Sequence, residues 1–144
     1  MKIVKVNENN IHLLVYFLSN LGSSSKSFRY FEKRNISIIQ HHLVTLLYLN
    51  NKDIPFCYGH LDKENNLVWL GLCVIESQTN KGYGTKMLNY LISEAKKANL
   101  NSINLSVDKS NNIAISLYKK FKFIQKSEDN NILYFYLNLL NENK

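Results

Sequence analysis

The pattern of hydrophobic and polar positions changes along the chain. Residues 2–6 alternate as in a short strand, and residues 11–18 then place apolar side chains at helical spacing. Residues 28–42 suggest one or two further helical turns. From residue 43 the pattern is that of strands, with short polar turns between them. The expected strands are 43–49, 54–61 and 67–74. Together they predict an antiparallel meander.

The second half of the chain alternates helices and strands. A single apolar stripe predicts a helix over residues 84–100, and it consists of Met87, Leu88, Leu91, Ile92 and Ala95. A strand at 102–107 precedes a helix over 111–121, for which Asp108 or Ser110 is the expected N-cap. Closing strands are expected at 122–127 and 132–139.

The predicted order of elements is β-α-α-β-β-β-α-β-α-β-β. Strands in the middle followed by crossover helices indicate an α/β (α+β) fold. We expect a mixed, mostly antiparallel central sheet of six or seven strands flanked by about four helices. The length fits a single domain over residues 1–144, and no repeat or linker divides the chain.

The chain is basic, with 18 Lys and Arg residues against 11 acidic ones and a net charge of +7. Such a charge suits nucleic acid, acidic lipid or a polyphosphate ligand. The basic residues are scattered, so nucleic acid is not favoured as a partner. The longest apolar run, residues 67–75, is far too short to span a membrane, so we expect a soluble protein without a membrane partner.

Two cysteines, Cys57 and Cys73, lie in predicted strands without a CxxC motif or a nearby His/Cys cluster. This pattern predicts neither a disulfide framework nor a metal site, and it suits a cytoplasmic protein. The Tyr- and Leu-rich strand near the C-terminus, expected at an edge of the sheet, would suit a homodimer.

Residues 79–88 read TNKGYGTKML and contain two of the five glycines. They lie between a buried strand and a helix, where exposed backbone N–H groups and the helix dipole attract phosphate. The spacing fits neither a Walker loop nor a dinucleotide-binding fingerprint. A plain turn that starts the helix explains these residues equally well.

A second motif places Asn111, Ala114 and Tyr118 on one helical face at i, i+3 and i+7. Together with the glycine loop, it resembles the GNAT superfamily of N-acetyltransferases. That superfamily combines a (Gln/Arg)-x-x-Gly-x-(Gly/Ala) loop with a helix of pattern Asn-x-x-Ala-x-x-x-Tyr, followed by Gly-Phe. The match is ungapped over residues 72–88 and 111–123. Thr79 and Lys122 depart from the pattern, at the positions of the usual Gln or Arg and of the usual Gly.

The resemblance implies that the loop binds the pyrophosphate of acetyl-CoA and that the main-chain N–H of Val74 faces the acetyl carbonyl oxygen. Lys81 would compensate for Thr79 as a point charge. Asn111 would bind the pantetheine arm, or it simply starts a helix. The full set of implied cofactor-binding residues is Leu72, Val74, Thr79, Asn80, Lys81, Gly82, Gly84, Thr85 and Asn111.

The resemblance also implies that Tyr118 protonates the departing thiolate, although a core tyrosine is the simpler alternative. For the general base we expect His60, placed opposite Trp69 if the 62–66 turn closes symmetrically. Asp62 and Glu64, both expected in that turn, and Glu76, just after a strand, are the alternatives.

The predicted function is therefore an acetyl-CoA-dependent N-acetyltransferase that acts on a primary amine of a small molecule. The amine would attack the thioester directly in a ternary complex, without an acyl-enzyme on either cysteine. Arg29 and Arg34 would suit an anionic acceptor such as a nucleotide-linked amino sugar. The alternative is a catalytically silent GNAT-like module that binds acyl-CoA as a sensor or scaffold.

Overall fold

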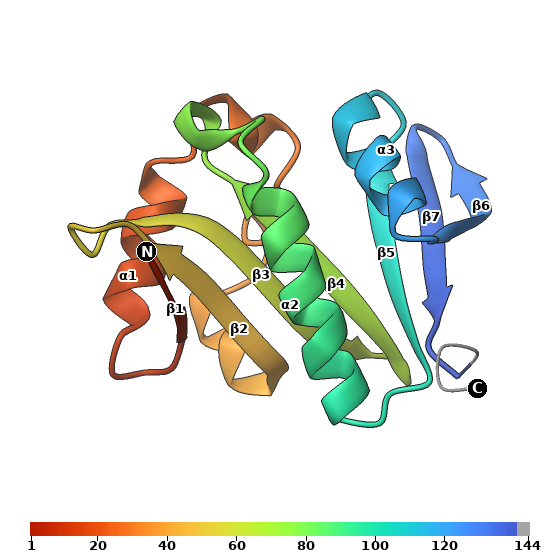
Figure 1. Cartoon of the computed structure of the whole chain (residues 1–144), viewed down its shortest axis with the longest axis horizontal. Helices are drawn as coiled ribbons and strands as arrows, with labels where there is room; N and C mark the ends of the chain where they lie inside the picture. Colours follow the sequence, from red (N-terminus) through yellow and green to blue (C-terminus); the bar gives the residue numbers. More distant parts are fainter. Residues whose placement is uncertain (141–144) are drawn as a thin grey trace.

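A single seven-stranded sheet organises the chain, with strand order β1-β2-β3-β4-β5-β7-β6 (Figure 1). The computed structural model describes residues 1–140, so the last four residues of the predicted domain lie outside the described part. Strands β4 and β5 run parallel, and the other neighbouring strands run antiparallel. The sheet thus confirms the predicted mixed, mostly antiparallel fold. The strands are β1 (Lys2–Lys5), β2 (His42–Leu49), β3 (Pro55–Glu64), β4 (Leu67–Val74), β5 (Ser102–Asp108), β6 (Ile124–Asp129) and β7 (Ile132–Asn138).

The helices cover both faces of this sheet. They are α1 (Ile11–Ser19), α2 (Tyr83–Lys97) and α3 (Asn112–Lys120), with short 3₁₀ turns η1 (Gly22–Lys26), η2 (Ile36–His41) and η3 (Glu76–Gln78). The predicted α2 stripe packs on β3 and β4. Four of its five residues are buried, and full burial of each large apolar side chain contributes roughly 1.5–3 kcal/mol. Helix α1 packs on β3 from the opposite face.

Residues 28–42 contain one helical turn, η2, where one or two were predicted. The Asn35 side chain accepts a hydrogen bond from the Ser37 N–H at 2.9 Å and starts η2. The residues between η1 and η2 form an irregular segment whose aromatic side chains pack on β3. Phe28 and Phe31 both contact the ring of Tyr58.

The β3–β4 hairpin closes over two residues, Asn65 and Asn66, and not over the five-residue turn that the sequence suggested. Both asparagines have positive φ, 53° and 65°, as a type I′ turn requires. The tighter turn shifts the register by two residues, so His60 lies opposite Gly71 and Asp62 lies opposite Trp69. The prediction that His60 faces Trp69 was therefore wrong. A shift of two keeps every side chain on its expected face.

The Tyr- and Leu-rich strand β7 lies between β5 and β6 and is not an edge strand. The edge strand at this end of the sheet is β6, whose six residues are exposed and mostly polar. Polar and charged edge strands resist pairing with a second chain. The prediction of a homodimer rested on β7 being an edge strand, so the structure does not support it.

Helix α3 ends with a left-handed residue that is not glycine. Lys122 has φ of 72°, and its N–H donates to the Lys119 carbonyl at 2.9 Å. The N–H of Phe123 donates to the Tyr118 carbonyl at 3.0 Å, and the two rings lie 5.7 Å apart. These contacts form a Schellman motif, in which glycine is the preferred residue at the left-handed position.

We expect Lys122→Gly to stabilise the protein by about 1 kcal/mol, because glycine adopts this conformation without a Cβ clash. A urea unfolding series at neutral pH measures the change. Lys120→Gly is the matched control, since it lies in the last turn of the same helix and should destabilise by about 1 kcal/mol. Equal effects of the two substitutions would contradict the assignment.

Candidate active site

A cleft opens where β4 and β5 separate. The two strands pair at one register position, Trp69 with Asn104, and then diverge towards the top of Figure 1. The cleft has a volume of about 770 Å³, and its walls come from β3 and β4 on one side and from β5, α3 and β7 on the other. This volume suits a small-molecule ligand.

The inner edge of β4 presents unpaired main-chain groups to this cleft. The Ile75 N–H donates to the Phe56 carbonyl at 3.0 Å, so the next pair, Cys57 with Val74, is a non-hydrogen-bonded pair. The N–H of Val74 therefore points away from β3 and towards the cleft. The same alternation applies to Leu72, two residues earlier.

The glycine loop lies at one end of the cleft. Gly82 is the N-cap of α2 with φ of 85°, a conformation that favours glycine, and a Cβ added there would meet no atom within 4 Å. The first bond of the helix runs from the Lys86 N–H to the Gly82 carbonyl. The N–H groups of residues 83–85 precede that bond, so they are free to bind an anion at the positive end of the helix dipole.

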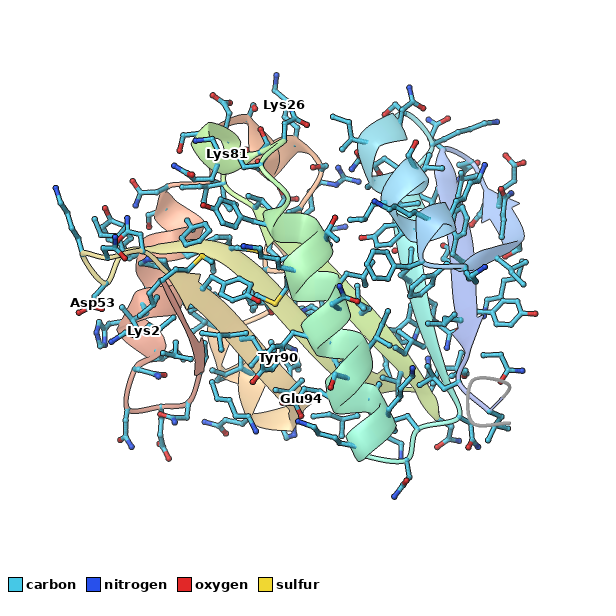
Figure 2. All side chains as sticks on the ribbon, in the orientation of Figure 1. Lys2, Lys26, Asp53, Lys81, Tyr90 and Glu94 are labelled. Atoms are coloured by element: carbon cyan, nitrogen blue, oxygen red, sulfur yellow. The ribbon has the colours of Figure 1, made fainter. Side chains whose placement is uncertain are left out.

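Most predicted cofactor residues line the cleft, namely Leu72, Val74, Thr79, Asn80, Gly82, Gly84, Thr85 and Asn111. Lys81 does not: its Nζ donates to Gln78 Oε1 at 3.4 Å, on the outer surface of the loop (Figure 2). The Thr79 hydroxyl donates to the Glu76 carbonyl at 2.9 Å. Neither side chain is arranged to replace the usual Gln or Arg.

Asn111 starts α3, where Asp108 or Ser110 was expected. Its Oδ1 accepts the Ala114 N–H at 3.2 Å, which leaves the Nδ2 donors for a ligand in the cleft. Two helical turns later Tyr118 also lines the cleft, and its side chain is only 6% exposed. Within residues 1–140 its hydroxyl has no hydrogen-bond partner, and no fully buried polar atom lacks one. The hydroxyl must therefore reach the surface of the cleft.

Burial controls the protonation of the groups near this hydroxyl. Burial, and to a smaller extent Cys73, raises the pKa of Tyr118 well above its ordinary value, so the phenol keeps its proton. Burial also raises the pKa of Cys73 to about 12 and that of Cys57 further. Both cysteines are buried strand residues, as predicted, and their thiols stay protonated.

His60 lines the opposite side of the cleft, on β3, and is 2% exposed. Its Nδ1 lies 2.6 Å from the hydroxyl of Tyr58, which is fully buried and has no other partner among the described residues. A buried phenol without an acceptor is costly, so Tyr58 donates to Nδ1. Burial, then His42 and Arg34, lowers the pKa of His60, so the ring is neutral and its proton is on Nε2. His60 thus offers an N–H donor, not a lone pair, to the cleft.

The three acidic alternatives occupy different positions. Asp62 is not in a turn as predicted but inside β3, where it is 6% exposed and lines the cleft. Glu64 is exposed at the rim and lies 3.9 Å from Arg34. Glu76 accepts the Ser23 N–H at 2.6 Å, and the Ser23 side chain together with this N–H lowers its pKa. Glu76 is tied to η1, outside the cleft lining.

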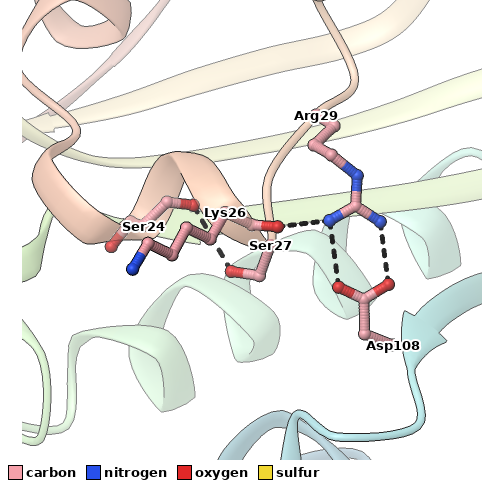
Figure 3. A network of polar contacts seen from close by, with 5 residues as sticks. All are labelled: Ser24, Lys26, Ser27, Arg29 and Asp108. Carbon is pink, nitrogen blue, oxygen red and sulfur yellow. Dashed lines mark hydrogen bonds and ion pairs between the residues drawn. The ribbon is translucent and has the colours of Figure 1, made fainter.

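An ion pair crosses the mouth of the cleft. Arg29, from the segment after η1, forms a bidentate pair with Asp108, the last residue of β5, at 2.8 and 3.1 Å (Figure 3). Arg29 also donates to the Lys26 carbonyl. This contact joins the segment after η1 to the end of β5, on the side where β4 and β5 have separated.

A model of the Acetyltransferase (GNAT) family matches residues 17–123. The chain belongs to this family. No curated protein matches its sequence. Within the described residues no helix is long and apolar enough to cross a membrane, and no cluster of three or more His, Cys, Asp or Glu side chains could hold a metal ion.

Solved structures show the same fold at low sequence identity. The GNAT domain of PAT from S. lividans superposes with a TM-score of 0.81 at 14% identity, covering 95% of this chain and 89% of that one. YncA from Salmonella typhimurium, solved with its cofactor acetyl-CoA, gives 0.77 at 13% identity, with 96% and 94% covered. The PaiA N-acetyltransferase from Thermoplasma acidophilum, in complex with coenzyme A, gives 0.75 at 18% identity, with 95% and 98% covered.

This GNAT protein also contains a network of hydrogen-bonded side chains beside the cleft, which the sequence did not predict. The Tyr30 hydroxyl donates to Asp62 Oδ2 at 2.7 Å and lies 2.7 Å from His42 Nε2. His42 Nδ1 lies 2.8 Å from the Thr45 hydroxyl. The alternation of β2 and β3 could have placed His42 and Asp62 on one face, but the irregular segment that carries Tyr30 has no periodic signal.

Buried neutral histidines make the stability of this GNAT chain depend on pH. Burial lowers the pKa of His42 to about 4, against 6.5 in the unfolded chain. Between these values the unfolded chain binds a proton that the folded chain does not. The contribution of these histidines to stability is therefore complete above pH 6.5 and falls as the pH drops towards 4, by up to about 1.4 kcal/mol per pH unit for each such histidine.

We expect urea unfolding between pH 7 and pH 4.5 to show this slope, and His42→Gln to reduce it by the share of one histidine. His12, exposed on α1, provides the control, because His12→Gln should leave the slope unchanged. A parent protein whose stability is flat over this range would contradict the neutral assignment.

Proposed function

We propose that this chain is an acetyl-CoA-dependent N-acetyltransferase that acetylates a primary amine of a small molecule in a ternary complex. The observation that carries the proposal is the cleft between the separated strands β4 and β5. It has free helix N–H groups at one end and the Tyr118 hydroxyl in its wall. The cofactor seen in YncA and the coenzyme A seen in PaiA support the same choice of acyl donor.

On the donor side, the N–H groups of residues 83–85 would hold the pyrophosphate, and Gly82 would allow its close approach. Asn111 Nδ2 would donate to the pantetheine arm. Lys81 and the Thr79 hydroxyl both form hydrogen bonds within the loop, which leaves this work to the main chain.

At the reacting centre, the Val74 N–H would stabilise the negative charge that develops on the acetyl oxygen. The amine lone pair forms the C–N bond and the C–S bond breaks. Tyr118 gives its proton to the thiolate. The nitrogen loses two protons over the reaction: one restores Tyr118 and the other leaves to solvent.

Our proposal differs from the sequence-based prediction in how the acceptor loses its proton. With Tyr58 donating to Nδ1, His60 can donate to the acceptor from Nε2 but cannot accept its proton without a change of tautomer. We therefore propose His60 as a hydrogen-bond donor in the cleft. Arg29 and Arg34, which suggested an anionic amino sugar, are paired with Asp108 and Glu64, so that acceptor stays a prediction without a structural basis.

We expect Tyr118→Phe to lower kcat by about a hundredfold or more, because the thiolate loses its proton donor, while the Kd for acetyl-CoA is unchanged. The assay follows thiol release from acetyl-CoA with a panel of primary amines. Tyr90→Phe, on α2 and outside the cleft lining, should retain full activity.

Unchanged turnover of the Tyr118→Phe variant at every pH would remove Tyr118 from the chemistry. A parent protein that binds acetyl-CoA and acetylates no amine in the panel would instead favour the silent acyl-CoA-binding module.

A further inference from the structure

Asp62 is a buried carboxylate without a cationic partner. It is 6% exposed, three residues before the β3–β4 turn, and no Lys, Arg or His nitrogen of the described residues forms an ion pair with it. Burying an uncompensated charge is costly, so such groups normally pair with a cation or coordinate a ligand.

One oxygen of Asp62 is held in place by a hydrogen-bond network. The Tyr30 hydroxyl has a single proton and donates it to Oδ2 at 2.7 Å. The short contact between Tyr30 and His42 therefore has the His42 Nε2–H as donor, and the Thr45 hydroxyl donates to His42 Nδ1. The three donors all point towards Asp62, so they hold the carboxylate in place and add no positive charge.

The other oxygen, Oδ1, has no hydrogen-bond partner within residues 1–140. Every fully buried side-chain polar atom in that part of the chain does have a partner, so Oδ1 must be accessible to solvent. Asp62 lines the cleft, and its unpaired oxygen therefore opens into it.

The surroundings of Oδ1 suit an organic cation. Trp69 lies directly opposite Asp62 on β4 and meets the ring of Tyr134 edge-on, with centroids 6.4 Å apart. Aromatic rings beside a carboxylate favour ammonium groups.

The positive side chains nearby already have partners. Arg34 stacks on the Tyr30 ring and lies 3.9 Å from Glu64, and Arg29 pairs with Asp108. Lys126, 5.9 Å from the Trp69 ring centre, donates to Asn104 Oδ1 at 2.7 Å. None of the three forms an ion pair with Asp62.

Asp62 is distant from the expected reacting centre. Trp69, its strand partner, lies five residues before Val74, which is roughly 16 Å along a strand at about 3.3 Å per residue. A group bound at Asp62 is therefore a different part of the acceptor from the nitrogen that is acetylated.

We propose that Asp62 Oδ1, together with Trp69, binds a second cationic group of the acceptor, so that the substrates of this cleft are diamines or longer polyamines. The inference rests on the proposed function, because it takes the reacting amine to lie near Val74. It assigns Asp62 to substrate binding and not to proton removal.

The test compares linear diamines, from 1,3-diaminopropane to 1,12-diaminododecane, with n-alkylamines of the same length. Calorimetry with the full chain, in the presence of coenzyme A, measures binding without any need for turnover. The parent should bind the best diamine roughly tenfold to a hundredfold more tightly than its monoamine, as a charge-assisted contact would give. Asp62→Asn keeps an acceptor for Tyr30 and should abolish the difference.

Glu64→Gln is the matched control, because it removes a carboxylate from the same strand at the exposed rim and should preserve the diamine preference. Kinetic assays provide a second readout: Asp62→Asn should raise KM for the diamine towards the KM for the monoamine.

Three results would overturn the inference. The parent could bind diamine and monoamine equally, a comparison that needs no variant. The Asp62→Asn variant could retain the preference. It could also lower kcat for both amines alike, as loss of a general base would. Failure of the proposed function is separate, because it would appear as a parent that does not bind acetyl-CoA, or that binds it and acetylates no amine.

Discussion

The structure depends on the point at which β4 and β5 stop pairing. Parallel strands normally satisfy their main-chain groups along their whole length, but here the ladder is limited to the position of Trp69 and Asn104. Beyond it, the N–H groups of β4 that face away from β3 need another partner. The separation thus creates both the space of the cleft and its unsatisfied main-chain donors, and a ligand that runs beside β4 can serve as the missing strand.

Other features of the fold keep this opening intact. Helix α2 packs on β3 and β4 and directs its N-terminus at the cleft, while α3 closes the far wall with Tyr118. The Arg29–Asp108 pair joins the two walls at the mouth, where no strand pairing holds them. On the opposite face, β3 carries Tyr58, His60 and Asp62 into a buried polar layer that faces the acceptor half. Donor binding therefore relies on main chain, and acceptor binding relies on side chains.

Regular spacing of apolar residues was enough to predict most elements of the fold, whereas local turn chemistry was not anticipated. The stripe of α2 and the three strands of the meander are periodic in the sequence, and the cleft results from their order. The register of the β3–β4 hairpin could not be predicted in this way, because two asparagines in left-handed conformations shorten the turn. That error placed Asp62 in the turn, whereas it is a buried residue of β3. Tyr30 and Arg29 lie on an irregular segment, and their partners are 32 and 79 residues away, so spacing carried no signal for either contact.

Acetyl-CoA binding measured by thermal unfolding tests the central claim most directly, using the parent protein and Gly82→Val. At about a hundred times the Kd, the ligand should stabilise the parent by roughly 2.7 kcal/mol and raise its midpoint by several degrees. The valine side chain would occupy the open space beside Gly82, where the phosphates are expected, so the shift should vanish in the variant. No shift in the parent, or the same shift in both proteins, would show that the glycine loop is not the phosphate site.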